Sequence, residues 1–232
     1  MAKQRPRRRT HALLAHKPAS VTQGHITVSP LSPKREKRQR AILACARDAF
    51  ADRGYHAVTI EEIVQRTGIA RGTFYLYFED KRAILSALLD AFLARITACI
   101  EPVDLEDSER SALEQLRANL QRVTQLVLDE PAMVRILLRS ATQVDGAFDA
   151  KRDAFYQTLN QYLEETVAAG QAAGLVRLGE RPWLRSMGMG ALQQLFLERV
   201  EGQLSGDAEA LTEGILAFLL QGLLTASMQG HP

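Results

Sequence analysis

Residues 59–81 read TIEEIVQRTGIARGTFYLYFEDK, and this stretch decides the fold. Thr59 and Glu62 have the spacing of a capping box, which begins a helix by satisfying its first free backbone N–H groups. Gly68 stands where this helix must end, because glycine adopts the left-handed conformation of a C-terminal cap at little cost. A second short helix is predicted over about 71–78. The stretch therefore predicts two helices joined by a glycine turn, which is the shape of a helix-turn-helix.

The aromatic residues of the second helix divide between two faces. Phe74 and Phe78 are one turn apart, so we expect them to face a small core. The residues left for the outer surface are Arg71, Thr73, Tyr75 and Tyr77. A helix-turn-helix places such a surface in the major groove of DNA. The same spacing would also suit an aromatic-rich helical hairpin in an ordinary core, so the flanking sequence has to decide.

Both flanks continue the helical pattern. Residues 40–54 have the periodicity of an amphipathic helix, and apolar residues recur at every fourth position from Ile84 to Ile100. With these flanks, residues 36–96 resemble the DNA-binding domain of the TetR (tetracycline-repressor) family of bacterial regulators. The residues that carry the resemblance are Ile42, Ala46, Phe50, Gly54, Tyr55, Thr59, Ile63, Gly68, Gly72, Thr73, Tyr75, Tyr77, Phe78, Lys81 and Leu85.

One position departs from the family's pattern. The family usually has Ser or Thr at the cap of the recognition helix, where this chain has Ala70. Replacing such a cap by Ala costs about 1 kcal/mol of helix stability. We therefore expect a looser start to this helix.

The resemblance implies DNA contacts from both helices of the motif. Thr59 opens the supporting helix, where it can meet a phosphate. Arg71 suits bidentate contact with guanine, and Thr73 can contact thymine or a phosphate. Gly72 lets the backbone come close to DNA. Lys81, at the start of the next helix, is expected to bind a phosphate.

Three more side chains of the second helix are interpreted from the same pattern. Tyr75 and Tyr77 should point at the groove or at its phosphate walls. Leu76 lies between them and is either a thymine-methyl contact or a packing residue. Of these two alternatives we favour packing.

The charge of the chain is unevenly distributed. Residues 1–40 hold eleven Lys or Arg and one acid, a net +10, and since the whole chain carries +2 the remainder carries −8. A basic front and an acidic back suggest nucleic acid at one end and another partner at the other.

Residues 1–34 are predicted to form a disordered basic arm, with RPRRR at positions 5–9 and three further prolines. Two interpretations stay open: the arm lies in the minor groove or along phosphates, or it is a poorly ordered tail. The apolar residues 12–15 are too few for a signal peptide, and no stretch approaches the ~20 apolar residues of a membrane span. We therefore expect a cytoplasmic protein.

Residues 97–230 predict helices throughout and no strand, which gives an all-α fold of about nine helices. The predicted helices of this part run from near Asp107 to Leu128, from Pro131, from about Phe148 to Ala169, from Pro182 to Val200 and from Asp207 to Leu224. We find no catalytic constellation and no phosphate-binding glycine motif here, and the only histidine after residue 96 is His231. No enzyme activity, metal or cofactor is expected.

The resemblance implies that residues 97–230 bind an effector and form a dimer. The candidate pocket residues are Phe92, Ile96, Leu120, Met133, Leu137, Phe155, Tyr156 and Leu159. Aliphatic walls favour a hydrophobic or amphipathic effector, and Arg135 and Arg139, one turn apart, can hold an anionic head group. The candidate dimer residues are Leu184, Gly188, Ala191, Leu195, Leu211, Ile215, Phe218 and Gly222.

Together these expectations describe a transcriptional regulator that binds a palindromic operator in double-stranded DNA as a homodimer. Repression relieved by the effector is the outcome we favour. The alternative is an architectural or partner-recruiting DNA-binding dimer that has no small-molecule effector.

Overall fold

The computed structural model describes residues 32–139, 146–174, 176–177 and 179–222. Within these residues there are nine α-helices and no β-strand, so the predicted all-α fold of about nine helices is confirmed. The helices are α1 (Pro33–Arg53), α2 (Ile60–Thr67), α3 (Arg71–Tyr75), α4 (Lys81–Cys99), α5 (Ala112–Asp129), α6 (Pro131–Arg139), α7 (Gly146–Ala172), α8 (Arg181–Val200) and α9 (Ala208–Gly222).

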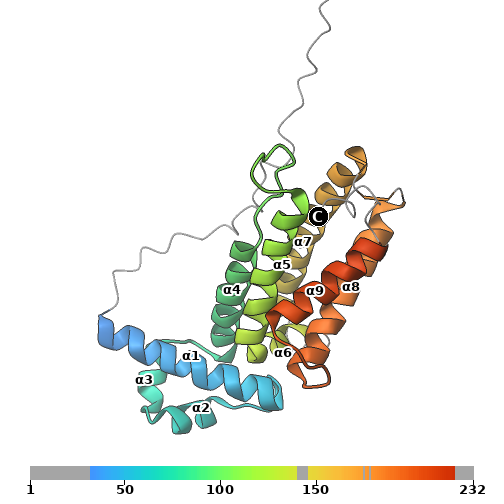
Figure 1. Cartoon of the computed structure of the whole chain (residues 1–232). Coiled ribbons are helices and arrows are strands. Elements are labelled where there is room, and N and C mark those ends of the chain that lie inside the picture. The colour runs from blue at the N-terminus through green and yellow to red at the C-terminus, as the bar shows by residue number, and fades with distance from the viewer. Residues whose placement is uncertain (1–31, 140–145, 175, 178, 223–232) are drawn as a thin grey trace, which may run out of the picture.

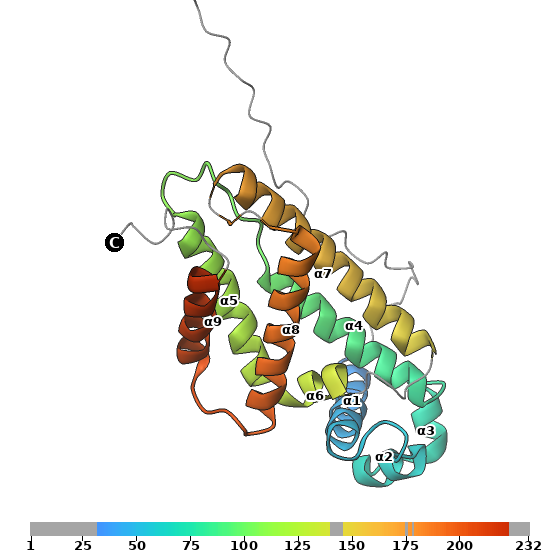
Figure 2. The ribbon, with the colours of Figure 1, turned by 90° about the vertical axis from the view of Figure 1, so that its right-hand side faces the viewer.

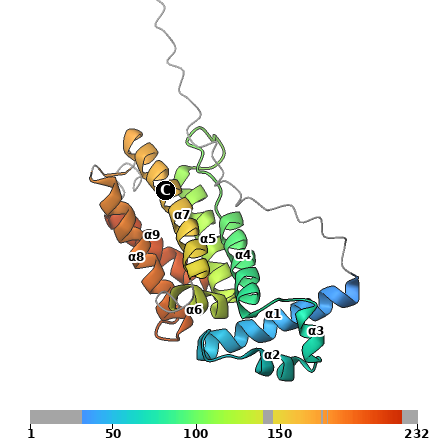
Figure 3. The ribbon, with the colours of Figure 1, turned by 180° about the vertical axis from the view of Figure 1, so that it is seen from behind.

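The helices form a small foot below a taller bundle (Figure 1). The foot consists of α1, α2 and α3, and α4 rises from it into the bundle beside α5 and α7. From behind, α6 lies against α1 at the junction between the two parts (Figure 3). On the other side of the bundle, α8 packs on α6 and α7, while α9 packs on α5 (Figure 2).

A continuous hydrophobic core joins the foot to the bundle. Phe74 of α3 is fully buried and Phe78 is 5% exposed, which confirms that these two rings face the core. The same cluster continues through Leu89 of α4 to Met133 of α6 and Phe148 of α7. Because α4 runs through the predicted domain boundary at residue 96, the core is shared across that boundary.

An ion-pair cluster reinforces the junction. Glu130, between α5 and α6, has a side chain that is only 18% exposed. Its carboxylate pairs with Arg95 of α4 and lies 3.8 Å from the guanidinium of Arg47 in α1. One carboxylate at the turn between α5 and α6 therefore links α1 of the foot to α4 of the bundle.

Two buried amides fasten the loop that follows α4. Asn119 donates to the carbonyl oxygen of Glu101 at 2.7 Å and accepts from its N–H at 3.0 Å. Gln115 makes the equivalent pair with the backbone of Asp104, at 2.8 Å in both directions. Helix α4 ends at Cys99, directly before the residues that these amides hold.

Two helix starts differ from the prediction. Helix α1 begins at Pro33, so the last two residues of the predicted arm are helical; residues 1–31 of that arm lie outside the described residues. Helix α5 begins at Ala112 instead of near Asp107, because Ser111 and Glu114 form the capping box that starts it. The carboxylate of Asp107 instead accepts from the backbone N–H groups of Glu109 and Arg110, in the turn before α5.

Three further observations concern the start of α9, the histidine of the tail and possible membrane spans. Asp207 accepts from the N–H of Ala210 at 2.9 Å, as expected of the residue that caps α9. His231 lies outside the described residues. None of the described helices is long and apolar enough to cross a membrane.

Candidate nucleic-acid interface

Helix α2 is held at both ends by the residues that the sequence indicated. The hydroxyl of Thr59 accepts from the N–H of Glu62 at 3.3 Å, and Gly68 has a φ of 67°, the left-handed conformation of a C-terminal cap. The second half of the predicted capping box is replaced. The Glu62 carboxylate pairs with Arg53 of α1, and this hydrogen bond is the main cause that lowers the pKa of Glu62. Helix α2 is thereby fixed to α1.

The recognition helix α3 is shorter than predicted and begins without a side-chain cap. Its helical residues are Arg71–Tyr75, whereas the sequence predicted a helix to about Phe78. Ala70 is extended at the N-cap position and offers no side-chain acceptor, as the missing Ser or Thr predicted. At the other end, the guanidinium of Arg35 donates to the carbonyl oxygen of Leu76 at 3.3 Å. A residue of α1 thus completes the C-terminal end of α3.

The outer face of the motif exposes most of the predicted contact residues. Thr59, Arg71 and Gly72 are exposed, and Thr73 is half-buried. No atom lies within 4 Å of where a side chain on Gly72 would start, so this position is open in the free protein. These residues lie in α3 or immediately before α2, at the foot of the molecule (Figure 1).

A row of polar contacts fixes Arg71 on this face. Its guanidinium lies 2.8 Å from the carboxylate of Glu61 in α2. A hydrogen bond with Tyr75 and the charge of Glu61 both raise the pKa of Arg71. The guanidinium is therefore held in place by two neighbouring side chains of the same surface.

Leu76 corrects one interpretation from the sequence. Its side chain is 70% exposed and Tyr75 beside it is 45% exposed, so Leu76 does not pack into the core. The alternative, an apolar contact with a thymine methyl group, fits this exposure. Leu76 has helical backbone angles and lies two residues from both Phe74 and Phe78, so its side chain faces away from the core that these two rings enter.

Tyr77 and Lys81 face other parts of the protein. The Tyr77 ring is half-buried, with the guanidinium of Arg35 at 5.7 Å from its centroid, so it is less available to DNA than predicted. The Lys81 ammonium donates to the carbonyl oxygens of Tyr55 at 2.7 Å and Val58 at 2.8 Å, and lies 3.4 Å from that of His56.

These contacts give Lys81 a structural role beside the phosphate contact that the sequence predicted, which stays a prediction. An ammonium has three protons to donate, and the carbonyls of the α1–α2 loop occupy them. The ammonium also lies 4.3 Å from the centroid of the Tyr55 ring, and burial lowers the pKa of Lys81. Lys81 therefore clamps the start of α4 to the loop that leads into α2.

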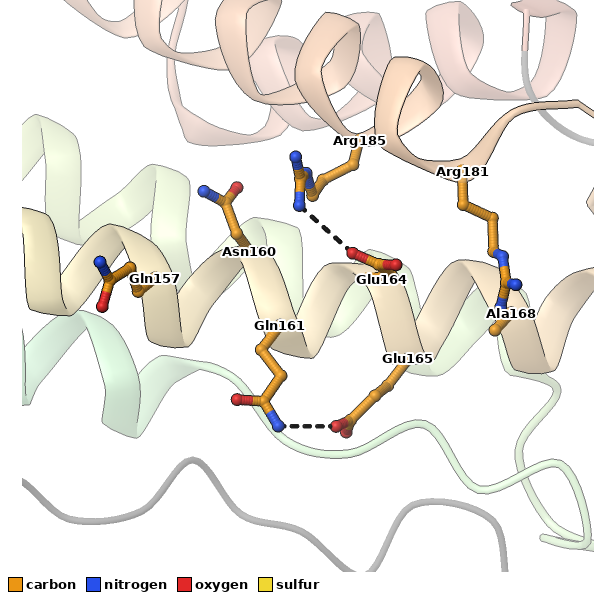
Figure 4. Close-up of a pocket in the computed structure, with 8 residues that line it drawn as sticks. All are labelled: Gln157, Asn160, Gln161, Glu164, Glu165, Ala168, Arg181 and Arg185. Carbon is orange, nitrogen blue, oxygen red and sulfur yellow. Dashed lines mark hydrogen bonds and ion pairs between the residues drawn. The ribbon is translucent and has the colours of Figure 1, made fainter.

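The predicted pocket residues do not line either of two cavities in the described part of the bundle. One is a groove of about 530 Å³ between α7 and α8, where Arg185 pairs with Glu164 at 3.3 Å and Gln161 with Glu165 at 3.1 Å (Figure 4). Its other lining residues are Gln157, Asn160, Ala168 and Arg181. Three predicted pocket residues are instead fully packed in the core: Phe92, Met133 and Leu137. The others are half-buried: Ile96, Leu120, Phe155, Tyr156 and Leu159.

The second cavity measures about 240 Å³ and lies where α4 and α7 both begin. Its apolar lining is formed by Leu85, Leu89 and Phe148. At its edge, Lys151 bonds to Ser86 and Asp90. Arg82 and Ala83 complete the lining. We name this cavity the α4–α7 pocket.

Arg135 and Arg139 do not form the head-group site that their spacing suggested. Arg135 donates to the carbonyl oxygen of Val200 at 3.1 Å, and Arg139 to the carboxylate of Glu201 at 2.5 Å. Both residues therefore bind the C-terminal end of α8, where free carbonyls and the helix dipole favour cations.

The predicted dimer residues divide between buried and exposed positions. Leu211 and Ile215 are 7% and 5% exposed because they face α5 of their own subunit, which corrects their assignment to a dimer surface. Leu184, Gly188 and Leu195 are half-buried, whereas Ala191 and Phe218 are exposed. Gly222 is the last residue of α9. The exposed residues that the prediction missed are Trp183 at 69% and Met187 at 58%.

Burial raises the pKa of both cysteine thiols, Cys45 and Cys99. No group of three or more His, Cys, Asp or Glu residues placed to hold a metal ion occurs in the part of the chain that the structure describes.

Comparison with known proteins supports the interpretation of the foot. Residues 42–88 match the family model described as bacterial regulatory proteins of the tetR family. The uncharacterized HTH-type transcriptional regulator YdgC of Bacillus subtilis (strain 168) is 27% identical over 190 residues, which cover 81% of this chain and 84% of YdgC.

Two solved structures share the fold. The MbdR regulator from Azoarcus sp. CIB has a TM-score of 0.67 and 27% identity, covering 81% of this chain and 100% of that one. FadR from Bacillus subtilis, solved in complex with stearoyl-CoA, has a TM-score of 0.62 and 22% identity over 79% of this chain and 98% of that one. At that identity the likeness to FadR concerns the fold alone.

The matched segment includes the whole helix-turn-helix described above, although Arg35, which contacts Leu76 and Tyr77, precedes it. It holds the cap at Thr59, the left-handed turn at Gly68, the exposed face of α3 and the clamp at Lys81. The family consists of regulators and not of enzymes, in agreement with the sequence. Residues 42–88 therefore form a DNA-binding domain of the TetR family of bacterial regulatory proteins, and the chain is a helix-turn-helix transcriptional regulator.

Proposed function

We propose that this regulator acts as a homodimer that represses transcription from a palindromic operator and releases it when an amphipathic effector binds. The observation that carries the proposal is the exposed face of α3, with Arg71, Tyr75 and Leu76 directed away from the core. Five helical residues reach only a few base pairs, so one subunit reads a short half-site. A two-fold pair of subunits reads two such half-sites and requires a palindrome.

The dimer surface we propose is the exposed stripe of α8 and α9. On α8 it contains Trp183, Met187, Gly190 and Ala191, which follow one another at helical spacing. On α9 it contains Phe218, which is 54% exposed, beside small residues at positions 210, 214 and 217. Large apolar side chains this exposed are costly in water, and the small residues let a second pair of helices come close. No residue of α8 is buried within the subunit.

The effector site we propose is the α4–α7 pocket. Its apolar lining suits a hydrocarbon segment, and Lys151 and Arg82 place positive charge at its edge, so an anionic amphiphile fits its chemistry. Lys151 already pairs with Asp90 at 2.7 Å, and a ligand carboxylate or phosphate would compete for that ammonium. The complex of FadR with stearoyl-CoA supports the choice of ligand class to test first.

The position of this pocket suggests how effector binding would change the affinity for DNA. It is lined by residues 82–89 of α4, directly after the Lys81 clamp that holds the α1–α2 loop. A ligand that moves the first turns of α4 would move the loop with it, and thereby Thr59 and α2. We propose that the ligand shifts the population of dimers away from the spacing that matches successive major grooves.

The first experiment selects DNA from a random library with the purified chain and sequences what is bound. We expect an inverted repeat whose half-sites are related by two-fold symmetry. Fluorescence anisotropy on that duplex then measures release by a panel of acyl-CoAs, free fatty acids and quaternary ammonium compounds. Selection of a single asymmetric site would contradict the dimer.

The alternative, a DNA-binding dimer without an effector, gives a different outcome in the same panel. It predicts that no compound changes operator affinity or melting temperature. A Lys151→Met variant, which keeps the length of the side chain, tests whether the effector binds in the α4–α7 pocket or in the groove between α7 and α8. If the α4–α7 pocket binds the effector, this variant needs more acyl-CoA for release. A neutral substitution in the groove between α7 and α8, Arg181→Gln, should leave the release curve unchanged.

A further inference from the structure

The first two turns of α1 carry a dense positive charge and lie outside the core. Five of the seven residues from Lys34 to Arg40 are Lys or Arg, and one is acidic. Residues 34–38 and 40 are exposed, and the first buried residue of α1 is Ile42. Hydrophobic packing therefore does not explain why these turns are helical. We call residues 33–40 the α1 extension.

The charge pattern of the α1 extension opposes the helix on its own. Lys34 lies one turn from Lys37 and Arg38, and Lys37 lies one turn from Arg40. Like charges at these spacings destabilise an isolated helix, and Glu36 offsets only part of the repulsion. A polyanion beside the extension would remove the remainder.

Arg35 anchors the α1 extension to the recognition helix. Its guanidinium donates to the carbonyl oxygen of Leu76, the C-cap of α3, at 3.3 Å, and lies 5.7 Å from the centroid of the Tyr77 ring. A cation is favoured at the C-terminal end of a helix and over an aromatic ring. The exposed cations are thereby placed beside the end of α3, as Figure 1 shows for the two helices.

We propose that the α1 extension is a second DNA-contacting element, which binds backbone phosphates next to the bases read by α3. Lys34, Lys37 and Arg38 would supply the phosphate contacts, while Arg35 keeps the element docked. The inference rests on the DNA-binding function and adds to it a sequence-independent part of the affinity. Double-stranded DNA carries one negative charge per ~1.7 Å of its axis, so several phosphates lie within reach of two helical turns. Such contacts position the protein and do not read the sequence.

The test measures how affinity depends on salt. The triple variant Lys34→Gln, Lys37→Gln, Arg38→Gln of the full chain is compared with wild type on a selected duplex and on a scrambled one. Fluorescence anisotropy gives the dissociation constant at roughly 50 to 300 mM salt. For every phosphate that a subunit no longer binds, the slope of log affinity against log salt should become shallower by about 0.9. The preference for the selected duplex over the scrambled one should persist, because no base contact is removed.

A matched control removes the same charge elsewhere. Arg110, Arg117 and Arg139 have exposed side chains in the bundle, and their replacement by Gln should leave the slope at the wild-type value. A wild-type slope in the α1-extension variant, with circular dichroism unchanged, would overturn the inference. Wild-type protein that binds neither duplex at any salt concentration would instead overturn the DNA-binding function itself, so the two failures are distinguishable.

Discussion

At the residue scale, Ala70 leaves the first N–H groups of α3 without a side-chain acceptor. Its backbone is already extended as an N-cap requires, so Ala70→Ser should place a hydroxyl at those groups without rearrangement. We expect the free energy of unfolding to rise by about 1 kcal/mol. Urea denaturation followed by circular dichroism measures this. An unchanged midpoint would mean that water already caps the helix equally well.

Gly72 is a position at which the effect of a substitution on stability can be distinguished from its effect on DNA binding. In the free protein a methyl group at this position meets no atom within 4 Å, and alanine favours a helix by up to about 1 kcal/mol over glycine. Gly72→Ala should therefore keep or raise the melting temperature and yet weaken operator binding, if the backbone approaches DNA here. Gly146→Ala, at another open helical glycine, is the control and should leave affinity unaltered.

Lys81 distinguishes a clamp from a phosphate contact. Lys81→Met keeps the chain length but removes the donor to the carbonyls of Tyr55 and Val58, so stability should fall by about 1–3 kcal/mol. Operator affinity should fall with it, because the loop before α2 loosens. The slope of affinity against salt should not change. A slope lower by about 0.9 per subunit would restore the phosphate role that the sequence suggested.

At the element scale, Glu130 joins α1 and α4 to the turn between α5 and α6. Glu130→Gln removes the charge that Arg47 and Arg95 share in a partly buried site, and we expect a loss of about 1–2 kcal/mol in unfolding free energy. Arg117→Gln breaks an exposed pair with Glu213 and should cost less than about 1 kcal/mol. Equal losses for the two variants, measured by urea denaturation, would show that the junction gains nothing from its burial.

The same elements show how far sequence reasoning reaches. Phe74 and Phe78 were placed in the core correctly because residues four apart share a face, and the turn continues past the end of α3, where the N–H of Phe78 donates to the carbonyl oxygen of Phe74 at 3.1 Å. The clamp made by Lys81 was not predicted because its partners lie 23 to 26 positions earlier, in a loop whose path no local pattern reveals. The start of α1 was missed for the same reason, since Arg35 meets Leu76 across 41 positions. The local signals were sufficient for the motif, and the contacts between elements were not.

Helix α8 shows why the sequence could not decide which of its apolar residues stay exposed. Its apolar residues occur all round the helix, from Leu184 and Leu195 to Trp183 and Met187. A pattern without a polar side cannot say which face meets α6 and α7 and which is left open. Only the packing of α8 on those two helices decides that Trp183 and Met187 remain exposed.

At the scale of the whole molecule, the exposed stripe of α8 and α9 is the surface through which we propose that two subunits, each with its own recognition helix, associate. Trp183→Glu with Met187→Glu places charge in the centre of this stripe, where a two-fold axis would bring each charge near its copy. We expect the variant to sediment as a monomer in analytical ultracentrifugation. The variant should bind a duplex with one half-site about as tightly as the wild-type protein does. A second half-site in the duplex should raise the affinity of the variant only a little. Leu105→Glu, at an exposed apolar position outside the stripe, should stay dimeric. If the double variant remains a dimer and still prefers the palindrome, the subunits associate through another surface, and the spacing of the recognition helices has to be derived from that surface instead.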